Sequence, residues 1–326
     1  MRCAALDGPA AYARRRNLNV YKRGQMEGRI FKALSGFYYV KTQNKVIYEC
    51  RAKGAFKNEG ITPLVGDNVT FQVTDAEKRE GIVKEIHPRK NELVRPTVSN
   101  VDQAMVIFAV KEPNPNFAIL DRFLLLMKKQ NVPVILVFNK RDLAKDGDIK
   151  RIKAVYKDSG CSMYFISAGV GGNAAKKDLF LLKQKLKGKV TVMAGPSGAG
   201  KSTLLNTLIA EAQDEPAVVG EISKRVGRGK HTTRHNELYE SKKGYCIIDT
   251  PGFTSLLVNS SDYTRENLKY AIPEFAPYED KCPFKDCTHI KERDCAVKKA
   301  VEEKKIPLSR YNSYKSIYEE LGSGKK

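Results

Sequence analysis

The stretch Gly195-Pro196-Ser197-Gly198-Ala199-Gly200-Lys201-Ser202-Thr203 constrains the fold more than any other feature of the sequence. It follows the apolar run 189–194 and precedes Leu204, Leu205, Leu208 and Ile209, which share one face at helical spacing. Strand, glycine-rich turn and helix in this order are the context of a phosphate-binding P-loop, whose N–H groups and helix N-terminus attract an anion. The sequence therefore predicts that Lys201 reaches the β- and γ-phosphates. The Ser202 hydroxyl is predicted to bind Mg²⁺, which prefers oxygen ligands.

Short apolar runs and amphipathic stretches alternate around this motif. Buried strands are expected at 103–110, 133–138, 161–166, 189–194 and 245–248, and helices at about 117–127, 147–158 and 175–187. Asn116 is the expected N-cap of the first helix, with Phe117, Leu120, Leu124 and Met127 on one face. This alternation predicts a doubly wound α/β domain whose ligands bind at the carboxyl ends of the strands.

The tetrapeptide Asn139-Lys140-Arg141-Asp142 follows the second expected strand and matches the pattern N-K-x-D. One carboxylate, that of Asp142, can accept from both N1–H and the 2-amino group of guanine, whereas adenine would leave its charge unpaired. Sites built on such pairing reject the wrong partner by up to about 10⁴–10⁵. Asn139 is expected to join this loop to the P-loop, and the Lys140 stem to pack over the base. The Ala168 N–H, after Ser167, is expected to contact the guanine oxygen.

The segment Asp249-Thr250-Pro251-Gly252 ends the last expected strand and fits the motif D-x-x-G. Asp249 is predicted to hold Mg²⁺ through water, and the Gly252 N–H to sense the γ-phosphate. A switch threonine upstream would complete the Mg²⁺ shell. We favour Thr233 for this role, with Thr232 as the alternative.

Together these loops resemble the motifs of a GTPase, an enzyme that hydrolyses GTP. Hydrolysis needs a group that orients the attacking water, and Phe253 occupies the place where many GTPases carry glutamine for this purpose. Phenylalanine cannot hydrogen-bond to water, so slow intrinsic hydrolysis is expected. We hypothesise that His231 positions the water or acts as general base. The alternative is that His231 is an exposed loop residue or an RNA contact, and turnover of His231→Ala distinguishes the two.

Ahead of these motifs, residues 25–95 contain five short β runs separated by turn signals. They suit a small closed barrel of the OB type, with another small β barrel as the alternative. Aromatic side chains stand among lysines and arginines in the second and third runs, so some rings could stack on bases while others form the core. These aromatics are Phe37, Tyr38, Tyr39 and Tyr48.

The composition favours a polyanionic partner, because 58 Lys and Arg against 37 Asp and Glu give a net charge of +21. No apolar run is long enough to span a membrane. Residues 1–24 are basic and lack the apolar segment of a secretory signal, so a disordered arm, a transit-like segment and a cloning remnant all stay open.

Three of the seven cysteines cluster with a histidine near the C-terminus. The pattern Cys282-x4-Cys287-x-His289-x5-Cys295 offers a closed Cys₃His set for structural Zn²⁺, with unmetallated cysteines as the alternative. Lysines and arginines surround it, and a polar helix expected at 296–304 carries several of them, either as contacts with nucleic-acid phosphates or as a solvated face. Cys50, Cys161 and Cys246 are interpreted as small core residues of a reducing compartment.

The guanine-reading loops precede the P-loop, which precedes the switches, so the motif order resembles that of a circularly permuted GTPase. With the aromatic β domain ahead and the cysteine cluster behind, the chain resembles the RsgA family of small-ribosomal-subunit-dependent GTPases. This resemblance implies an OB-type domain at 25–95, a permuted GTPase domain at 96–273 and a helical zinc domain at 274–326. It also implies a monomeric cytoplasmic enzyme that uses GTP with Mg²⁺, is stimulated by the small subunit and its rRNA, and acts late in subunit maturation.

Two other functions fit parts of the sequence. A nucleotide kinase would share the P-loop, but Asp142 and Asp249 argue against it, and comparing GTP with ATP hydrolysis separates the two. An RNA-binding module that keeps the GTPase fold only as a scaffold would not need Lys201, Ser202 and Asp249. Normal turnover of Lys201→Ala would favour that module.

Overall fold

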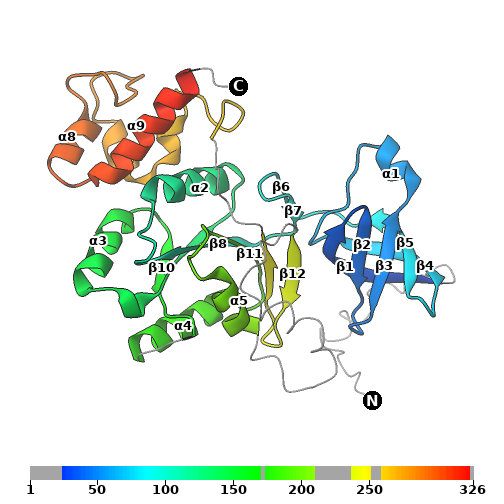
Figure 1. Ribbon diagram of the computed structural model, residues 1–326. Helices are drawn as coiled ribbons and strands as arrows, with labels where there is room; N and C mark the ends of the chain where they lie inside the picture. The colour runs from blue at the N-terminus through cyan, green and yellow to red at the C-terminus, as the bar shows by residue number, and fades with distance from the viewer. Residues whose placement is uncertain (1–23, 170–172, 210–235, 251–257, 324–326) are drawn as a thin grey trace, which may run out of the picture.

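The computed structural model describes residues 24–169, 173–209, 236–250 and 258–323 (Figure 1). The expected basic segment at 1–24 lies outside this part of the chain, except for its last residue. Within the described ranges, no helix combines the length and the apolar character needed to cross a membrane.

The first part of the chain is a five-stranded barrel, as expected. Its strands are β1 (Gln25–Leu34), β2 (Phe37–Lys41), β3 (Ile47–Ala52), β4 (Asn68–Asp75) and β5 (Glu80–Ile86), with the short helix α1 (Gly54–Asn58) between β3 and β4. The barrel closes because β1 pairs with both β2 and β4, while β3 and β5 pair in parallel. This closed order, 1-2-3-5-4-1, leaves no free edge within the barrel.

Successive side chains of a strand point to opposite faces, so some aromatic side chains of the barrel point into its core and others toward its surface. Tyr48 packs inward, its ring centroid 5.1 Å from that of the buried Phe71. Phe37 instead lies under the Arg51 guanidinium at 4.8 Å, and Tyr39 under the Lys32 ammonium at 5.6 Å. The structure thus sorts the aromatics into two groups that the sequence left mixed.

The central domain is the expected doubly wound sheet. Its strands are β8 (Gln103–Ala109), β9 (Val134–Asn139), β10 (Ser162–Phe165), β11 (Val190–Ala194), β12 (Glu237–Glu240) and β13 (Cys246–Asp249), in the order β10-β9-β8-β11-β13-β12. Only β12 runs antiparallel to its neighbour β13. The helices are α2 (Phe117–Lys129), α3 (Asp146–Tyr156), α4 (Asn173–Leu186) and α5 (Lys201–Ile209), with a 3₁₀ turn, η2, at Arg141–Leu143.

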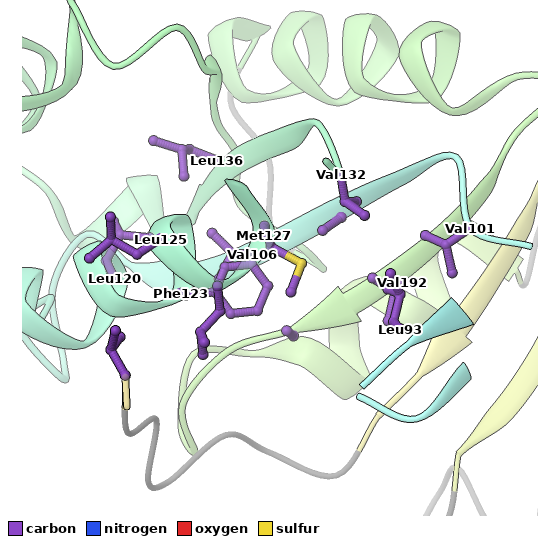
Figure 2. Close-up of a cluster of buried hydrophobic side chains, with 14 of the residues drawn as sticks. Leu93, Val101, Val106, Leu120, Phe123, Leu125, Met127, Val132, Leu136 and Val192 are labelled. Carbon is purple, nitrogen blue, oxygen red and sulfur yellow. The ribbon is translucent and has the colours of Figure 1, made fainter. Parts of the chain in front are cut away.

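Helices cover both faces of this sheet, so its strands are buried on both sides. On one face Leu182, Leu186 and Leu204 of α4 and α5 pack on the sheet, and on the other α2 contributes Leu120, Phe123 and Met127 (Figure 2). Asn116 caps α2 by accepting from the Ile119 N–H at 3.3 Å, as the sequence predicted.

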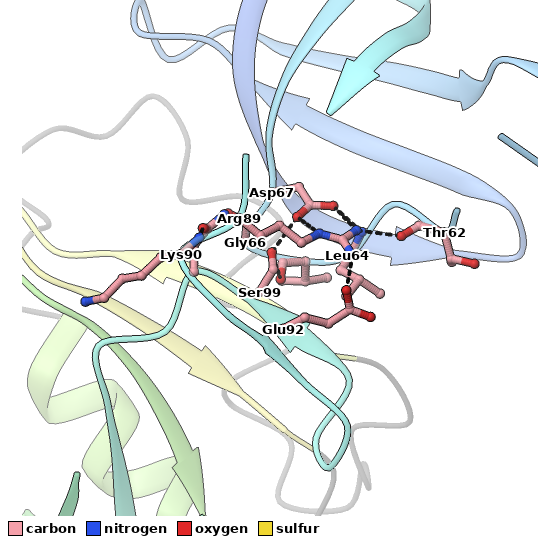
Figure 3. Close-up of polar contacts among 10 residues, drawn as sticks. Thr62, Leu64, Gly66, Asp67, Arg89, Lys90, Glu92 and Ser99 are labelled. Carbon is pink, nitrogen blue, oxygen red and sulfur yellow. Dashed lines mark hydrogen bonds and ion pairs between the residues drawn. The ribbon is translucent and has the colours of Figure 1, made fainter. Parts of the chain in front are cut away.

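A two-stranded hairpin, β6 (Glu92–Leu93) with β7 (Val98–Ser99), stands between the barrel and the central domain, on either side of the expected boundary at 95. Arg89 anchors the chain there, because its Nε and Nη2 donate to the two carboxylate oxygens of Asp67, each at 2.8 Å (Figure 3). Asp67 is fully buried and also accepts from the Ser99 hydroxyl at 2.6 Å. The Asp67 hydrogen bonds raise the pKa of Arg89.

The C-terminal part is helical: η4 (Leu268–Ala271), η5 (Pro273–Phe275), α7 (Ala276–Glu279), α8 (Ala296–Glu302) and α9 (Leu308–Gly322). Helix α9 lies across α2 (Figure 1). The side chains of Arg310, Asp121 and Glu274 form ion pairs in this interface, all at most 4 % exposed. A buried charge network therefore connects the C-terminal helices to the central domain.

Candidate nucleotide and metal sites

The P-loop connects β11 to α5, so its residues lie at the carboxyl edge of the sheet. Helix α5 begins at Lys201, and the Leu204 N–H donates to the Gly200 carbonyl at 2.9 Å. Gly200 has φ +84°, and a Cβ there would lie 2.3 Å from the Asn139 Nδ2. Only glycine fits this approach, because a side chain would collide with Asn139, which begins the 139–142 loop.

Lys201 points back into its own loop. Its Nζ donates to the carbonyls of Gly195 at 2.8 Å and Pro196 at 3.0 Å. Burial lowers the pKa of Lys201, and the charge of Asp249 opposes this shift. The ammonium is thus held where phosphate oxygens can replace the two carbonyls.

Asn139 joins three loops in one place. Its Nδ2 donates to the Ala199 carbonyl of the P-loop at 3.0 Å, and its Oδ1 accepts from the Ala168 N–H at 2.9 Å. The side chain is 2 % exposed, so both bonds are shielded from water. The carboxyl ends of β9, β10 and β11 are therefore fixed relative to one another, as the sequence suggested for the first and third.

The 139–142 loop is further held by hydrogen bonds from its backbone N–H groups. The Asp142 N–H donates to the Ser167 hydroxyl at 3.1 Å, and the Arg141 N–H donates to the Ile166 carbonyl at 3.0 Å. These bonds position the Asp142 backbone beside the loop that carries Ala168. Contact of either residue with a base stays a prediction.

Residues 111–116 also lie at this edge, and the sequence analysis gave them no part in the site, since it assigned only an N-cap to Asn116. The Lys140 Nζ donates to the Glu112 carbonyl. Pro113 packs on the P-loop, its Cδ 3.4 Å from where a Cβ on Gly198 would lie. The segment directly follows β8, a parallel strand. Because ligands of such sheets bind at the carboxyl ends of the strands, this position is the signal that could have identified it from the sequence.

Asp249 ends β13 at the same edge and is 8 % exposed. The Thr250 hydroxyl donates to the Met193 carbonyl of β11 at 2.8 Å, which fixes the start of the D-x-x-G loop next to the P-loop strand. Gly252, Phe253, His231, Thr232 and Thr233 lie outside the described residues, so their predicted roles stay predictions.

Cys282, Cys287, His289 and Cys295 converge, with their ligand atoms all within 4.8 Å of one another. The His289 Nδ1 lies 3.6 Å from the Cys282 Sγ and 3.3 Å from the Cys295 Sγ. In a tetrahedral zinc site with Zn–S bonds of about 2.3 Å, sulfur atoms are about 3.8 Å apart, so the four side chains fit such an ion. This cluster could hold a metal ion.

The loop that carries these ligands is supported from several directions. The hydroxyls of Tyr311 and Tyr314 on α9 donate to the carbonyls of His289 and Thr288, and the Lys269 Nζ donates to the Cys287 carbonyl at 3.0 Å. Cys295 also caps α8, its Sγ accepting from the Lys298 N–H at 3.5 Å. The ligand loop and the last two helices therefore depend on each other.

Comparisons with known proteins agree with this geometry. The RsgA GTPase family model matches residues 86–259 and the RsgA N-terminal domain model matches residues 27–83. The chain is 45 % identical over 311 residues to the small ribosomal subunit biogenesis GTPase RsgA of Agathobacter rectalis, covering 92 % of this chain and all of that protein. It is 45 % identical over 296 residues to the protein of the same name from Clostridium perfringens, covering 91 % of this chain and 98 % of that one.

Comparison with solved structures also finds GTPases of this kind. The chain is similar to YloQ, described as a circularly permuted GTPase, at 34 % identity and a TM-score of 0.69, over 93 % of this chain and 97 % of that one. It is similar to YjeQ from Thermotoga maritima at 31 % identity and a TM-score of 0.71, over 93 % of this chain and 100 % of that one. Since both family models and near-full-length relatives match, the chain is a GTP-hydrolysing enzyme and belongs to the RsgA GTPase family.

Proposed function

We propose that this GTPase acts on the small ribosomal subunit late in its maturation, that the subunit stimulates hydrolysis, and that the bound nucleotide controls how long the enzyme stays. The observation that carries the nucleotide part is the convergence of the guanine loops and the P-loop on Asn139, with Asp249 at the same edge of the sheet. The relatives' names carry the ribosomal part.

Each nucleotide-site residue has a chemical task in this proposal. Asp142 accepts from the guanine edge and the Ala168 N–H donates to the guanine oxygen. The P-loop N–H groups, with Lys201, bind the phosphates. Ser202, Asp249 and Thr233 would hold Mg²⁺, which neutralises charge that develops on the phosphate oxygens. His231 is the hypothesised residue that positions water.

We also propose that the Cys₃His cluster binds one structural Zn²⁺. All four ligands come from the protein, so no position is left open for catalysis. The ion would fix the loop 282–295, whose buried side chains are three of the ligands themselves, Cys287, His289 and Cys295. This support places the surrounding lysines and arginines where they can meet rRNA phosphates.

The barrel is the second proposed RNA contact. Phe37 and Tyr39 lie on its surface beside Arg51 and Lys32, a combination suited to stacking on bases and meeting phosphates. The net charge of +21 supports a polyanionic partner of this kind. We expect the enzyme to act as a cytoplasmic monomer.

The experiment that tests this function is the GTP turnover rate with and without purified small subunits at two salt concentrations. We expect stimulation by the subunit that weakens at high salt, because phosphate contacts release counterions. Lys201→Ala should abolish turnover in both conditions. A rate that the subunit leaves unchanged would contradict the ribosomal part alone.

Specificity gives a sharper test of the guanine site. Asp142→Asn replaces one acceptor with a donor, so guanine loses two charge-assisted hydrogen bonds while the 2-oxo group of xanthine gains a partner. We expect GDP affinity to fall by at least about 100-fold and xanthosine diphosphate to bind better than GDP. The measurement is titration with fluorescent forms of both nucleotides. Asp146→Asn, a change in the first turn of the nearby helix α3, is the control that should leave GDP binding intact.

A further inference from the structure

The barrel and the nucleotide site share one sheet. Strand β12 pairs with β13 on one side and with the barrel strand β1 on the other, so the strands of both domains form a single sheet of 11 strands. Residues in register on adjacent strands point to the same face of a sheet. A charge on the barrel can therefore lie near the nucleotide site without any contact through loops.

One line of register partners crosses this junction. Lys32 of β1 lies opposite Glu237 of β12, Glu237 lies opposite Asp249 of β13, and Asp249 lies opposite Met193 of β11. We call Lys32, Glu237 and Asp249 the charged row. Since adjacent strands are about 4.8 Å apart, Glu237 is about one strand spacing from Asp249 and Lys32 about two.

The charged row places two carboxylates directly opposite each other. Like charges at such positions repel, because their Cβ atoms are only about 4.5–5.5 Å apart. Glu237 is half-buried and Asp249 is 8 % exposed, so water screens this repulsion incompletely. A cation near Asp249 relieves the repulsion, and Lys32 supplies positive charge from the other end.

Lys32 belongs at the same time to the barrel surface. Its ammonium lies 5.6 Å from the centre of the Tyr39 ring, and Tyr39 is its register partner on β2. Tyr39 in turn makes an edge contact with Phe31, with ring centroids 6.3 Å apart. Lys32 is thus the group that the aromatic surface of the barrel and the charged row have in common.

We propose that Glu237 and Lys32 are positioning residues that tune, with opposite signs, how strongly Asp249 holds the Mg²⁺ of the bound nucleotide. Glu237 adds negative charge beside Asp249 and strengthens the hold. Lys32 adds positive charge and weakens it, so a polyanion that engages Lys32 at the barrel strengthens Mg²⁺ retention. This inference rests on the proposed role of Asp249.

The test measures release of fluorescent GDP from the full chain as a function of free Mg²⁺, at about 50 mM salt, where screening is weak. For Glu237→Gln we expect the Mg²⁺ concentration at the midpoint of GDP release to rise about tenfold, since a full negative charge near the ion is lost. For Lys32→Gln we expect the midpoint of GDP release to fall about threefold, a smaller shift because the lost charge is at least two strand spacings from Asp249. Lys32→Arg keeps the charge and should keep the wild-type midpoint.

Glu240→Gln is the matched control. Glu240 lies on the same strand and also contacts the barrel, through an ion pair with Lys41 at 2.6 Å, but its register partner is Cys246 rather than Asp249. We expect its midpoint to stay within about twofold of wild type, since one lost surface pair costs little.

The direction of each midpoint shift distinguishes an electrostatic effect on Mg²⁺ binding from a loss of structure. Loss of structure at the junction would move the midpoint upward for all the neutral substitutions, so a rise for Lys32→Gln, or no shift for Glu237→Gln, overturns the proposal. Thermal unfolding of each variant shows that the protein is folded. If GDP release from the wild-type protein ignores Mg²⁺, the proposed nucleotide site itself fails and the inference falls with it; a normal wild-type response with unshifted variants rejects the inference alone.

Discussion

At the scale of single residues, short polar side chains join segments that are distant in the chain. Asn139 bonds to two loops at once, and Asp67 bonds to Arg89, Ser99 and the Leu64 N–H. The sequence identified Asn139 because it belongs to a motif with known chemistry. It could not identify Asp67, since an aspartate in a turn between strands is ordinarily a solvated residue.

Replacing Asp67 with asparagine tests this anchor. The change keeps the shape but leaves the Arg89 guanidinium without its carboxylate, and Arg89 keeps only Glu92 and the Thr62 carbonyl. We expect the free energy of unfolding to fall by about 2–3 kcal/mol, below the full cost of breaking a buried pair because Arg89 is partly exposed. Denaturant unfolding measures it.

Asp75→Asn is the control for this prediction. Asp75 is more exposed and pairs with Lys78 at 3.7 Å. We expect a change within about 0.5 kcal/mol. An equal loss for both variants would contradict an anchoring role that is specific to Asp67.

At the scale of elements, the sequence located the strands and helices of the central domain to within a few residues, except for β12 (Glu237–Glu240), which it did not predict. The helix expected at 117–127 is α2 (Phe117–Lys129), and the one expected at 175–187 is α4 (Asn173–Leu186). Periodicity sufficed because each element buries one face or both. It did not reveal how α9 packs, since Tyr311 and Tyr314 pack their rings in the core and also donate hydrogen bonds from their hydroxyls to the cysteine loop.

Metal removal tests that dependence. We expect one zinc per chain, loss of the metal in Cys287→Ser, and a lower unfolding temperature when a strong chelator is added, because metal binding contributes on the order of 10 kcal/mol to such sites. Cys246→Ser, outside the cluster, should retain the metal. Metal content by atomic absorption and thermal unfolding provide the readouts. A chain that unfolds at the same temperature with and without chelator would exclude a structural metal.

At the scale of the whole molecule, the barrel, the central domain and the C-terminal helices are held together by strand pairing and by buried ion pairs. The barrel joins the central sheet through β1 and β12, and the C-terminal helices join it through Arg310, Asp121 and Glu274. Tyr156 adds a hydrogen bond from its hydroxyl to Asp121 at 2.9 Å. Burial raises the pKa of Asp121, against the opposing influence of Arg310, so the network depends on that arginine.

Arg310→Met should therefore destabilise the docked C-terminal helices. It leaves two buried carboxylates without their shared partner, at a cost of about 3–5 kcal/mol. Arg122→Met is the matched control, since Arg122 joins the same two helices through Glu320 but is more exposed, and we expect about 1 kcal/mol or less. Thermal unfolding and limited proteolysis measure both. Equal effects would show that the interface depends on its area rather than on the buried charges.

The sequence by itself determined most strands and helices of the central domain, the order of the nucleotide motifs and the composition of the metal cluster, because these depend on local periodicity and on residue types at fixed spacing. Only the tertiary structure decided which barrel aromatics face outward, that residues 111–116 line the P-loop, and that Lys32 and Asp249 share a row of one sheet. Those features arise from pairing and burial between residues far apart in the chain, and local patterns carry no information about which distant strand or helix supplies the partner.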